Sequence, residues 1–290
     1  MPAVSIIVPV YNTAPYLRRC LDSLRAQSLA DIEVVAVDDA SIDGSLEVLR
    51  EYAARDARIR VIRHPQNMGL HVTRMTGVAA STGTYVGYVD SDDYVAETMF
   101  ASLYARATED DADIVRGGAH LYLTRPGEAT CRTGELRFVE RRFARGVDYL
   151  DADFYPSMCL HLHRRRLWEL ALPSLPAIRI VGEDNLTAFI LAHLAGRVVT
   201  TADCDYHYME RLDSLSGDTS IASILHHIKD RARILSMLDA FVSQRHDAAR
   251  HALEGVLASN RALVLEYIAG LTDERERVRA QAAFDEHWRT

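Results

Sequence analysis

Three carboxylates follow an apolar segment at Asp90-Ser91-Asp92-Asp93. The preceding residues 84–89 (TYVGYV) are mostly aromatic and β-branched, which is typical of a strand. Acids at the end of a parallel strand lie at the carboxyl edge of the sheet, where ligands bind in open α/β sheets. Asp90 and Asp92 could both approach one Mg²⁺ ion, which favours one or two carboxylates together with substrate phosphate oxygens. The alternative is an acidic turn in which Asp93 caps the next helix.

Two earlier apolar segments are expected to bring polar groups to the same edge. Residues 4–10 end at Tyr11, and residues 32–37 end at Asp38-Asp39. The flat ring of Tyr11 could stack on a base, and the carboxylate of Asp39 could accept a hydrogen bond from a base N–H or a ribose hydroxyl. The alternative for the second segment is that Ser41 or Asp43 caps the following helix.

Arg74 is the candidate cation of this edge. It lies one turn past Gly69 in the predicted helix 70–80. Its fork of donors could reach the same pocket as the strand-end acids. The alternative is an ordinary surface arginine.

The elements that position these residues alternate along the first third of the chain. The expected strands are 4–10, 32–37, 59–63 and 84–89, and the expected helices are 14–27, 45–55 and 70–80. This β-α-β order predicts a parallel sheet with right-handed crossovers. The middle of the chain is less regular, with expected strands at 113–115, 119–139 (around a turn at 125–127), 157–163 and 197–208, and a helix at 186–194.

The composition becomes helical after about residue 217. We therefore expect a sheet domain over 1–217, with halves 1–94 and 95–217, and a helical region over 218–290. Apolar faces over this region predict two or three helices packed as hairpins. They could cover the sheet domain, or they could form a homo-oligomer or recognise a partner or acceptor.

Bulk properties narrow the class of protein. The chain has 290 residues and a net charge of −8, and the acidic balance argues against nucleic acid as a partner. The four cysteines form no C-x-x-C pair, so reduced thiols are expected. The start of the chain does not resemble a signal peptide, and no apolar stretch approaches the roughly 20 residues that span a bilayer. We expect a cytoplasmic protein, and leave open a peripheral contact at the inner face of the membrane through Arg141-Arg142 or Arg164-Arg165-Arg166.

Four segments between residues 4 and 94 carry a family resemblance: VSIIVPVYNTAPYLRRCLDSLRAQSL, IEVVAVDDASIDGS, NMGLHVTRMTG and GTYVGYVDSDD. In this order they resemble the nucleotide-binding half of the family 2 glycosyltransferases. The resemblance implies the GT-A fold, a Rossmann-like, mostly parallel α/β sheet flanked by helices. It also implies inverting transfer of a sugar from a nucleoside-diphosphate sugar, usually UDP-linked, with Mg²⁺ or Mn²⁺. Beyond residue 94 the resemblance is loose, in the part where such enzymes choose acceptors.

The resemblance also implies roles for single residues. The nucleotide would be held by Pro9, Tyr11, Asp38, Asp39, Arg74, Asp90 and Ser91. Asp92 would ligate the metal that bridges the diphosphate, with Asp90 beside it. Some relatives add a late histidine to the metal, and His207 is the candidate here. The family commonly has Asn after the arginine, whereas this chain has Met75.

The family needs a general base, often in a Glu-Asp pair at the start of a helix, and Gly182-Glu183-Asp184 fits this pattern. A carboxylate within hydrogen-bond reach can take the proton of the acceptor hydroxyl during attack. Asp184 is our first choice and Glu183 the reserve; the alternative is that both acids only serve the helix dipole. The segment ERLDSLSG, with Arg211 and Ser214, resembles the family's mobile loop that closes over phosphate.

The leading hypothesis is therefore transfer of one sugar to a glycan, lipid-linked or small-molecule acceptor. A processive synthase is disfavoured, because no Q-x-x-R-W motif occurs. The alternatives are a non-catalytic nucleotide-sugar binder and a sugar nucleotidyltransferase, although the latter usually carries a Gly-rich loop after the first strand. A dehydrogenase is disfavoured because no G-x-G-x-x-G follows a strand. A zinc site at Cys159, His161 and His163 lacks a recognisable fourth ligand, and either histidine could instead face the acceptor.

Overall fold

The computed structural model describes residues 1–124, 130–211, 220–245 and 249–288. The first third of the chain has the predicted alternation of strands and helices. The strands are β1 (Val4–Val10), β2 (Ile32–Asp38), β3 (Ile59–Arg63) and β4 (Tyr85–Tyr88), and the helices between them are α1 (Ala14–Arg25), α2 (Ser45–Arg55) and α3 (Leu70–Ala80). All seven residues of β1 are buried, as expected for a strand that helices cover on both faces.

The main sheet has the strand order β3-β2-β1-β4-β10-β6-β11-β9. The four strands from β3 to β4 are parallel, as predicted. The later strands are β6 (Ile114–Arg116), β9 (Arg141–Phe143), β10 (His161–Arg164) and β11 (Val198–Thr200). Strand β10 inserts antiparallel between β4 and β6. A mixed sheet results, and all strand tips that carry the predicted nucleotide residues lie in its parallel part.

Two strand predictions for the middle of the chain were wrong in extent. The strand expected at 157–163 begins only at His161, because the N–H of Met158 points to Asp184 Oδ2 (3.3 Å) and not to a neighbouring strand. The strand expected at 197–208 is two strands in different sheets, β11 and β12 (Tyr206–Arg211). The chain leaves the main sheet after Thr200 and pairs again in a second sheet.

The second sheet has the order β5-β12-β7-β8. Its other strands are β5 (Tyr94–Val95), β7 (Ala119–Thr124) and β8 (Cys131–Leu136). Strands β7 and β8 confirm the predicted short strands, and the expected turn at 125–127 lies outside the described residues. Because β5 directly follows the acidic segment, this sheet ties residues 90–93 to β12.

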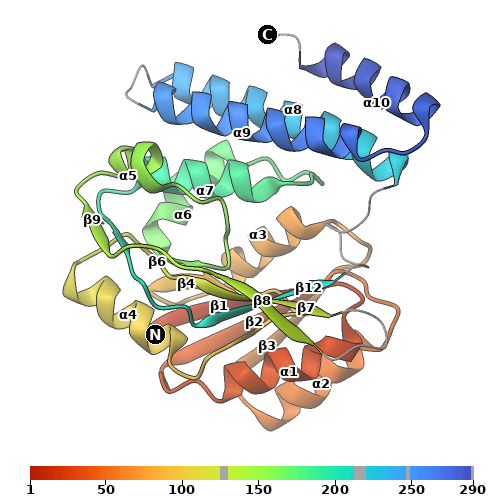
Figure 1. The fold of residues 1–290 in the computed structure, drawn as a ribbon. Helices are drawn as coiled ribbons and strands as arrows, with labels where there is room; N and C mark the ends of the chain where they lie inside the picture. The colour runs from red at the N-terminus through yellow and green to blue at the C-terminus, as the bar shows by residue number, and fades with distance from the viewer. Residues whose placement is uncertain (125–129, 212–219, 246–248, 289–290) are drawn as a thin grey trace.

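Helices form layers on both faces of the main sheet (Figure 1). Helices α1 and α2 lie on one face, and α3 lies on the other with α7 (Glu183–Leu194). The remaining helices of the middle are α4 (Met99–Glu109), α5 (Gly146–Asp153), α6 (Arg165–Ala171) and a short 3₁₀ turn at Leu172–Ser174.

The C-terminal region is helical, as predicted, with α8 (Ile221–Ser243), α9 (Arg250–Ala269) and α10 (Glu274–His287). Helices α8 and α9 stack over α7 (Figure 1). Apolar residues of α8 such as Ile234 and Leu238 join the main hydrophobic core, so this region covers the sheet domain. The expected boundary at residue 217 lies outside the described residues. Among the helices described, none has both the length and the apolar character that crossing a membrane requires.

Candidate active site

The carboxyl ends of three neighbouring strands meet, as the sequence predicted. After β1, the N–H of Asn12 donates to Ser41 Oγ (3.1 Å) and that of Thr13 to Ser45 Oγ (3.1 Å), both in the segment that follows β2. The hydroxyl of Thr13 also donates to Ser91 Oγ (2.9 Å), in the acidic segment after β4. Side chains at these three strand ends can therefore act on one ligand.

Asp39 is buried and organises the start of α3. Its Oδ1 accepts from the N–H of Met68 (2.8 Å), its Oδ2 accepts from the N–H of Gly69 (2.9 Å), and the Nδ1 of His64 lies 2.7 Å from Oδ1. Gly69 has φ +88°, a backbone conformation that favours glycine. The carboxylate thus fixes the turn from which α3 presents Arg74, a function that the sequence did not reveal.

The other nucleotide candidates differ in exposure. Pro9 is buried inside β1 opposite Val37. Asp38 is buried at the end of β2, where its Oδ1 accepts from the N–H of Ser41 (3.2 Å). Tyr11, by contrast, is 48% exposed directly after β1. Tyr11 is therefore well placed to offer its ring to a ligand.

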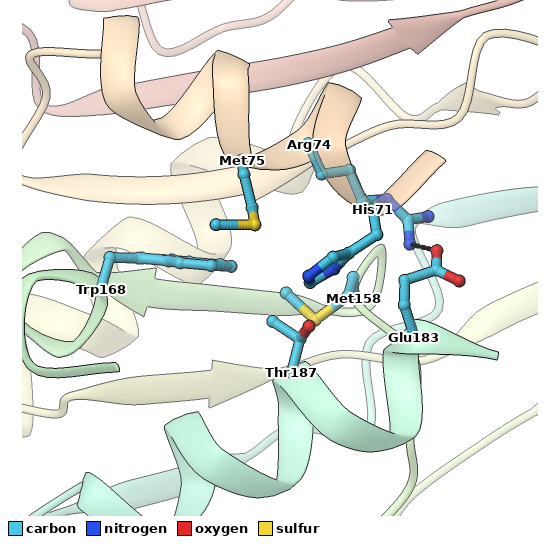
Figure 2. Close-up of a pocket in the computed structure, with 7 residues that line it drawn as sticks. All are labelled: His71, Arg74, Met75, Met158, Trp168, Glu183 and Thr187. Atoms are coloured by element: carbon cyan, nitrogen blue, oxygen red, sulfur yellow. Dashed lines mark hydrogen bonds and ion pairs between the residues drawn. The ribbon is translucent and has the colours of Figure 1, made fainter. Parts of the chain in front are cut away.

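A buried arginine joins the acidic strand end to the predicted base. Arg74 is 5% exposed, so the alternative of a surface arginine was wrong. Its Nη2 donates to Asp90 Oδ1 (2.9 Å), and its Nη1 donates to Glu183 Oε1 (2.8 Å) and to Asp184 Oδ1. Figure 2 shows Arg74 of α3 facing Glu183 of α7. One guanidinium thus brings together acids that lie about a hundred residues apart in the sequence.

The acidic pair titrates unusually. Burial, followed by the negative charge of Asp184, raises the pKa of Glu183 to about 7, and the charge of Arg74 opposes this rise. Burial is also the largest cause that raises the pKa of Asp184, again against Arg74. Buried carboxylates whose pKa values are raised in this way are candidates for general acid–base chemistry.

The two acids differ in access to solvent. The side chain of Asp184 is 27% exposed, whereas that of Glu183 is 7% exposed. Both lie in the first turn of α7 after Gly182, which has φ +82°. The helix dipole favours negative charge there, so that alternative is compatible with the structure too. Only Asp184 combines this position with access to an incoming molecule.

Asp93 has a structural role that the sequence analysis missed. It is buried, and its carboxylate accepts from the hydroxyl of Tyr206 (2.6 Å) and from the N–H of Met209 (2.7 Å). The expectation that Asp93 caps the next helix was wrong, since the N-cap of α4 is Thr98. Asp93 instead ties the acidic segment to β12. The sequence alone gave no signal for which of Asp90, Asp92 and Asp93 turns inward.

Asp90 and Asp92 remain partly exposed beside this anchor, with 29% of the Asp90 side chain exposed. The described residues contain no group of three or more His, Cys, Asp and Glu side chains that could hold a metal ion. A cation here would thus have one or two protein carboxylates and would need further ligands from a substrate. Mg²⁺ sites at phosphates commonly have this form.

His207 lies on β12 among aromatic side chains. Its ring stacks on Tyr94 with centroids 4.3 Å apart, and its Nδ1 lies 3.3 Å from the hydroxyl oxygen of Tyr122. Burial, helped by the charge of nearby His120, lowers its pKa to about 4. The imidazole is therefore neutral at physiological pH, and its described contacts are with rings and not with Asp92.

The phosphate-loop candidates lie at the limit of the described chain. The backbone of Arg211 pairs with Thr124 at the end of β12. The side chain of Arg211 and all of Ser214 lie outside the described residues.

The Cys159-His161-His163 run does not form a zinc site. Cys159 precedes β10, and its Sγ lies 3.9 Å from Nη2 of Arg74. His161 and His163 are buried, and Nε2 of His161 lies 2.9 Å from the hydroxyl of Tyr149. The expectation that either histidine could face the acceptor was therefore wrong, because both rings point into the core.

A small cavity lies beside the cluster that Arg74 forms with Asp90, Glu183 and Asp184, called the arginine cluster below (Figure 2). It is lined by His71, Arg74, Met75, Met158, Trp168, Glu183 and Thr187. Its volume of about 10 Å³ leaves room for about one water molecule. Ligand pockets commonly measure about 300–1,000 Å³, so this cavity is too small to hold a substrate.

Comparison with known proteins agrees with the fold. Residues 5–168 match the model of a family described as "Glycosyl transferase family 2". Over 118 residues the chain is 51% identical to "Uncharacterized glycosyltransferase EpsJ" of Bacillus subtilis, a match that covers 41% of this chain and 34% of that protein. The chain thus spans about a third of the length of the first curated relatives it matches.

Two solved structures resemble nearly the whole chain. S. aureus TarS 1–349 in complex with UDP-GlcNAc has a TM-score of 0.62 and 18% identity, with 99% of this chain and 89% of TarS covered. The mannosyltransferase PcManGT of Pyrobaculum calidifontis, in complex with GDP-Man and Mn²⁺, has a TM-score of 0.60 and 19% identity, with 98% and 81% covered. At such low identity the likeness concerns the fold.

Proposed function

The chain belongs to glycosyl transferase family 2, and we propose that it moves one sugar from a UDP-linked donor to an acceptor hydroxyl with inversion. One observation carries the proposal: Arg74 contacts both Asp90 at the strand edge and the acidic pair of α7. Donor acids and acceptor base would then flank one reacting centre. Because the attack is a single in-line displacement, the configuration of the anomeric carbon inverts.

Asp92, with Asp90 beside it, would hold Mg²⁺ or Mn²⁺ against the diphosphate. The partial exposure of both acids supports this role, since partly exposed carboxylates can reach a cation that also binds phosphate oxygens of the substrate. When bound, the metal would stabilise the charge that develops on the leaving diphosphate. The complex of PcManGT contains Mn²⁺, which supports a divalent ion here. His207 stays a candidate ligand only if the stack with Tyr94 opens.

Asp184 would take the proton of the acceptor hydroxyl, with Glu183 in reserve. An alcohol is a poor nucleophile at neutral pH, so a carboxylate near it assists the attack. Solvent access favours Asp184, whereas the raised pKa of Glu183 leaves it partly protonated near neutral pH. Arg74 would orient both acids and limit their mutual repulsion.

The nucleotide would lie across the three strand ends. Tyr11 would stack on the base, and the edge formed by Asp39, Arg74 and Ser91 would hold the ribose and base. Pro9 and Asp38 would shape the loops beneath them, since Pro9 lies within β1 and Asp38 Oδ1 accepts from the N–H of Ser41 (3.2 Å). The acceptor would be a glycan, a lipid-linked intermediate or a small molecule, and the part of the chain after residue 94 would provide its binding site. We also propose that the protein contacts the membrane surface peripherally. Self-association would take place through α8–α10.

A thermal-shift panel tests the donor. UDP, GDP and their common sugar conjugates are added with and without Mn²⁺, since a ligand that binds the folded state raises the melting temperature. We expect a metal-dependent shift with UDP. A flat response to every nucleotide would overturn the donor assignment, and a shift with GDP alone would change the nucleotide.

Release of UDP from the donor, with or without an added acceptor, tests the base. Asp184→Asn is expected to lower turnover by about 10²–10⁴ while the thermal shift with UDP and Mn²⁺ persists. Glu183→Gln serves as the matched variant and should lose far less. Unchanged turnover in Asp184→Asn would show that another group takes the proton.

A further inference from the structure

We infer that the C-terminal helices are part of the catalytic apparatus: Asp230 of α8 and Asn260 of α9 act as positioning residues for the turn that carries Glu183 and Asp184. The inference rests on the proposed role of that acidic pair. It assigns a task to a region for which the sequence suggested only coverage of the sheet domain, oligomerisation or partner recognition.

Asp230 fixes the chain just before α7. Its Oδ2 accepts a hydrogen bond from the N–H of Val181 (2.9 Å), two residues before Glu183. The side chain of Asp230 is only 12% exposed, and the Nε2 of His226, one turn earlier on α8, lies 3.2 Å from the same oxygen. A buried carboxylate is costly unless it is hydrogen-bonded, and here its partners are the backbone N–H of Val181 and the ring of His226.

Asn260 fixes the first turn of α7 from α9. Its Nδ2 donates to Asn185 Oδ1 (3.2 Å) and to the carbonyl of Val256 (2.9 Å). Its Oδ1 accepts from Nη1 of Arg231 on α8. Asn260 is 5% exposed, so both ends of its amide are used inside the protein. Asn185 follows Asp184 directly, so this contact bears on the proposed base.

Arg231 of α8 packs against the turn at Gly182, just before α7. A Cβ built on Gly182 would lie 3.5 Å from the guanidinium carbon of Arg231, at ordinary contact distance. Gly182 has φ +82°, which side-chain-bearing residues rarely adopt. The turn is thus fixed by hydrogen bonds on both sides of the acids and packed by Arg231 at Gly182.

The distribution of polar groups along α8 supports positioning over simple coverage. Farther along the helix, the buried side chains are apolar, as at Ile234, Leu235 and Leu238. The polar contacts gather where α8 and α9 meet the acidic turn. From the opposite side, Arg74 of α3 holds the carboxylates themselves. Glu183 and Asp184 are therefore held by Arg74 of the nucleotide-binding half, while α8 and α9 hold the residues that flank them.

Asp230→Ala and Asp230→Asn test the inference in the full-length chain, with donor turnover, UDP affinity in Mn²⁺ by calorimetry and urea denaturation as readouts. A displacement of about 1 Å at a reacting group can cost about 100-fold in rate. We expect Asp230→Ala to lower kcat by about tenfold or more while the Kd for UDP stays within about twofold. Asp230→Asn keeps an oxygen that accepts from Val181 and should restore most of kcat.

Asp239→Ala is the matched control. Asp239 lies farther along α8 in an exposed pair with Arg250, with 56% of its side chain exposed, and this variant should keep its kcat. A double-mutant cycle with Asn185→Ala and Asn260→Ala adds a second test. If the two amides act through each other, the double variant should lose no more kcat than either single one.

The outcomes separate this inference from the proposed function. If Asp230→Ala and Asn260→Ala lower stability but leave kcat unchanged, the positioning role is refuted. A parallel loss of kcat and UDP affinity would likewise refute it, because the whole domain would then be disturbed. If Asp184→Asn and Glu183→Gln both keep full turnover, the proposed base fails, whatever the helix variants do.

Discussion

Glu183→Gln should change how the stability of the protein depends on pH. Glu183 is buried in the arginine cluster, where Arg74, Asp184 and Asp90 face it and the charge of Arg231 reaches it. Burial and the neighbouring acids disfavour its charged form more than Arg74 favours it. Replacing the carboxyl by an amide of the same shape removes this cost only at a pH where the carboxyl is ionised.

The magnitude follows from the pKa of Glu183, which rises from 4.5 to about 7 on folding. At about 1.36 kcal/mol per pH unit, this difference corresponds to about 3 kcal/mol. Because the folded pKa lies above the unfolded one, the contribution to stability is fully present below pH 4.5 and is lost as the pH rises through 7. Relative to the wild type, Glu183→Gln should therefore gain about 3 kcal/mol between these limits.

Urea denaturation of both proteins from pH 5 to pH 8 at constant ionic strength measures the difference. The exposed Glu47 of α2 lies away from the cluster, and Glu47→Gln provides the baseline. A difference between Glu183→Gln and wild type that stays constant across this range would refute the raised pKa. A constant difference is also what Arg74 would produce if it held the pKa of Glu183 at or below 4.5, because the carboxyl would then stay ionised in both states from pH 5 to pH 8.

Three other variants test the proposed metal ligand Asp92, the close packing at Gly146 and the hydrogen bond from Tyr206 to Asp93. Asp92→Asn should abolish the Mn²⁺-dependent part of UDP binding in calorimetry; unchanged metal dependence would remove Asp92 from the metal site. Gly146→Ala should lower the free energy of unfolding by about 1–3 kcal/mol or more, because its Cβ would collide with the carbonyl oxygen of Ala192; wild-type stability in urea would contradict this close approach. Tyr206→Phe leaves Asp93 without its hydroxyl donor and should cost about 1–3 kcal/mol; a smaller cost would mean that Met209 alone suffices.

The sequence determined the elements and their order in the first third of the chain. Periodic apolar residues identified β1 to β4 and α1 to α3 with errors of one or two residues at the ends. Parallel pairing then required the strand tips to meet, as the bonds from Thr13 to Ser45 and Ser91 confirm. The start of α7 at Glu183 was also readable, because Gly182 and two acids precede an apolar run.

The tertiary structure decided which polar groups face inward and what they contact. Sequence could not show that Asp39 holds the start of α3, or that Asp93 binds Tyr206 and not a helix end. Nor could it show that the strand at His161 runs antiparallel. Hydrophobic periodicity reports the environment of a segment, not its partner. For Arg74 and the acids of α7, that partner lies more than a hundred residues away.

The C-terminal helices give the sharpest case. Their apolar faces predicted helices and packing, yet Asp230 and Asn260 look like ordinary polar positions in the sequence. Only the stacking of α8 and α9 on α7 brings them to Val181 and Asn185. A local pattern fixes how a helix is formed, whereas the contacts of its polar side chains depend on which surface it packs against, and long-range folding alone selects that surface.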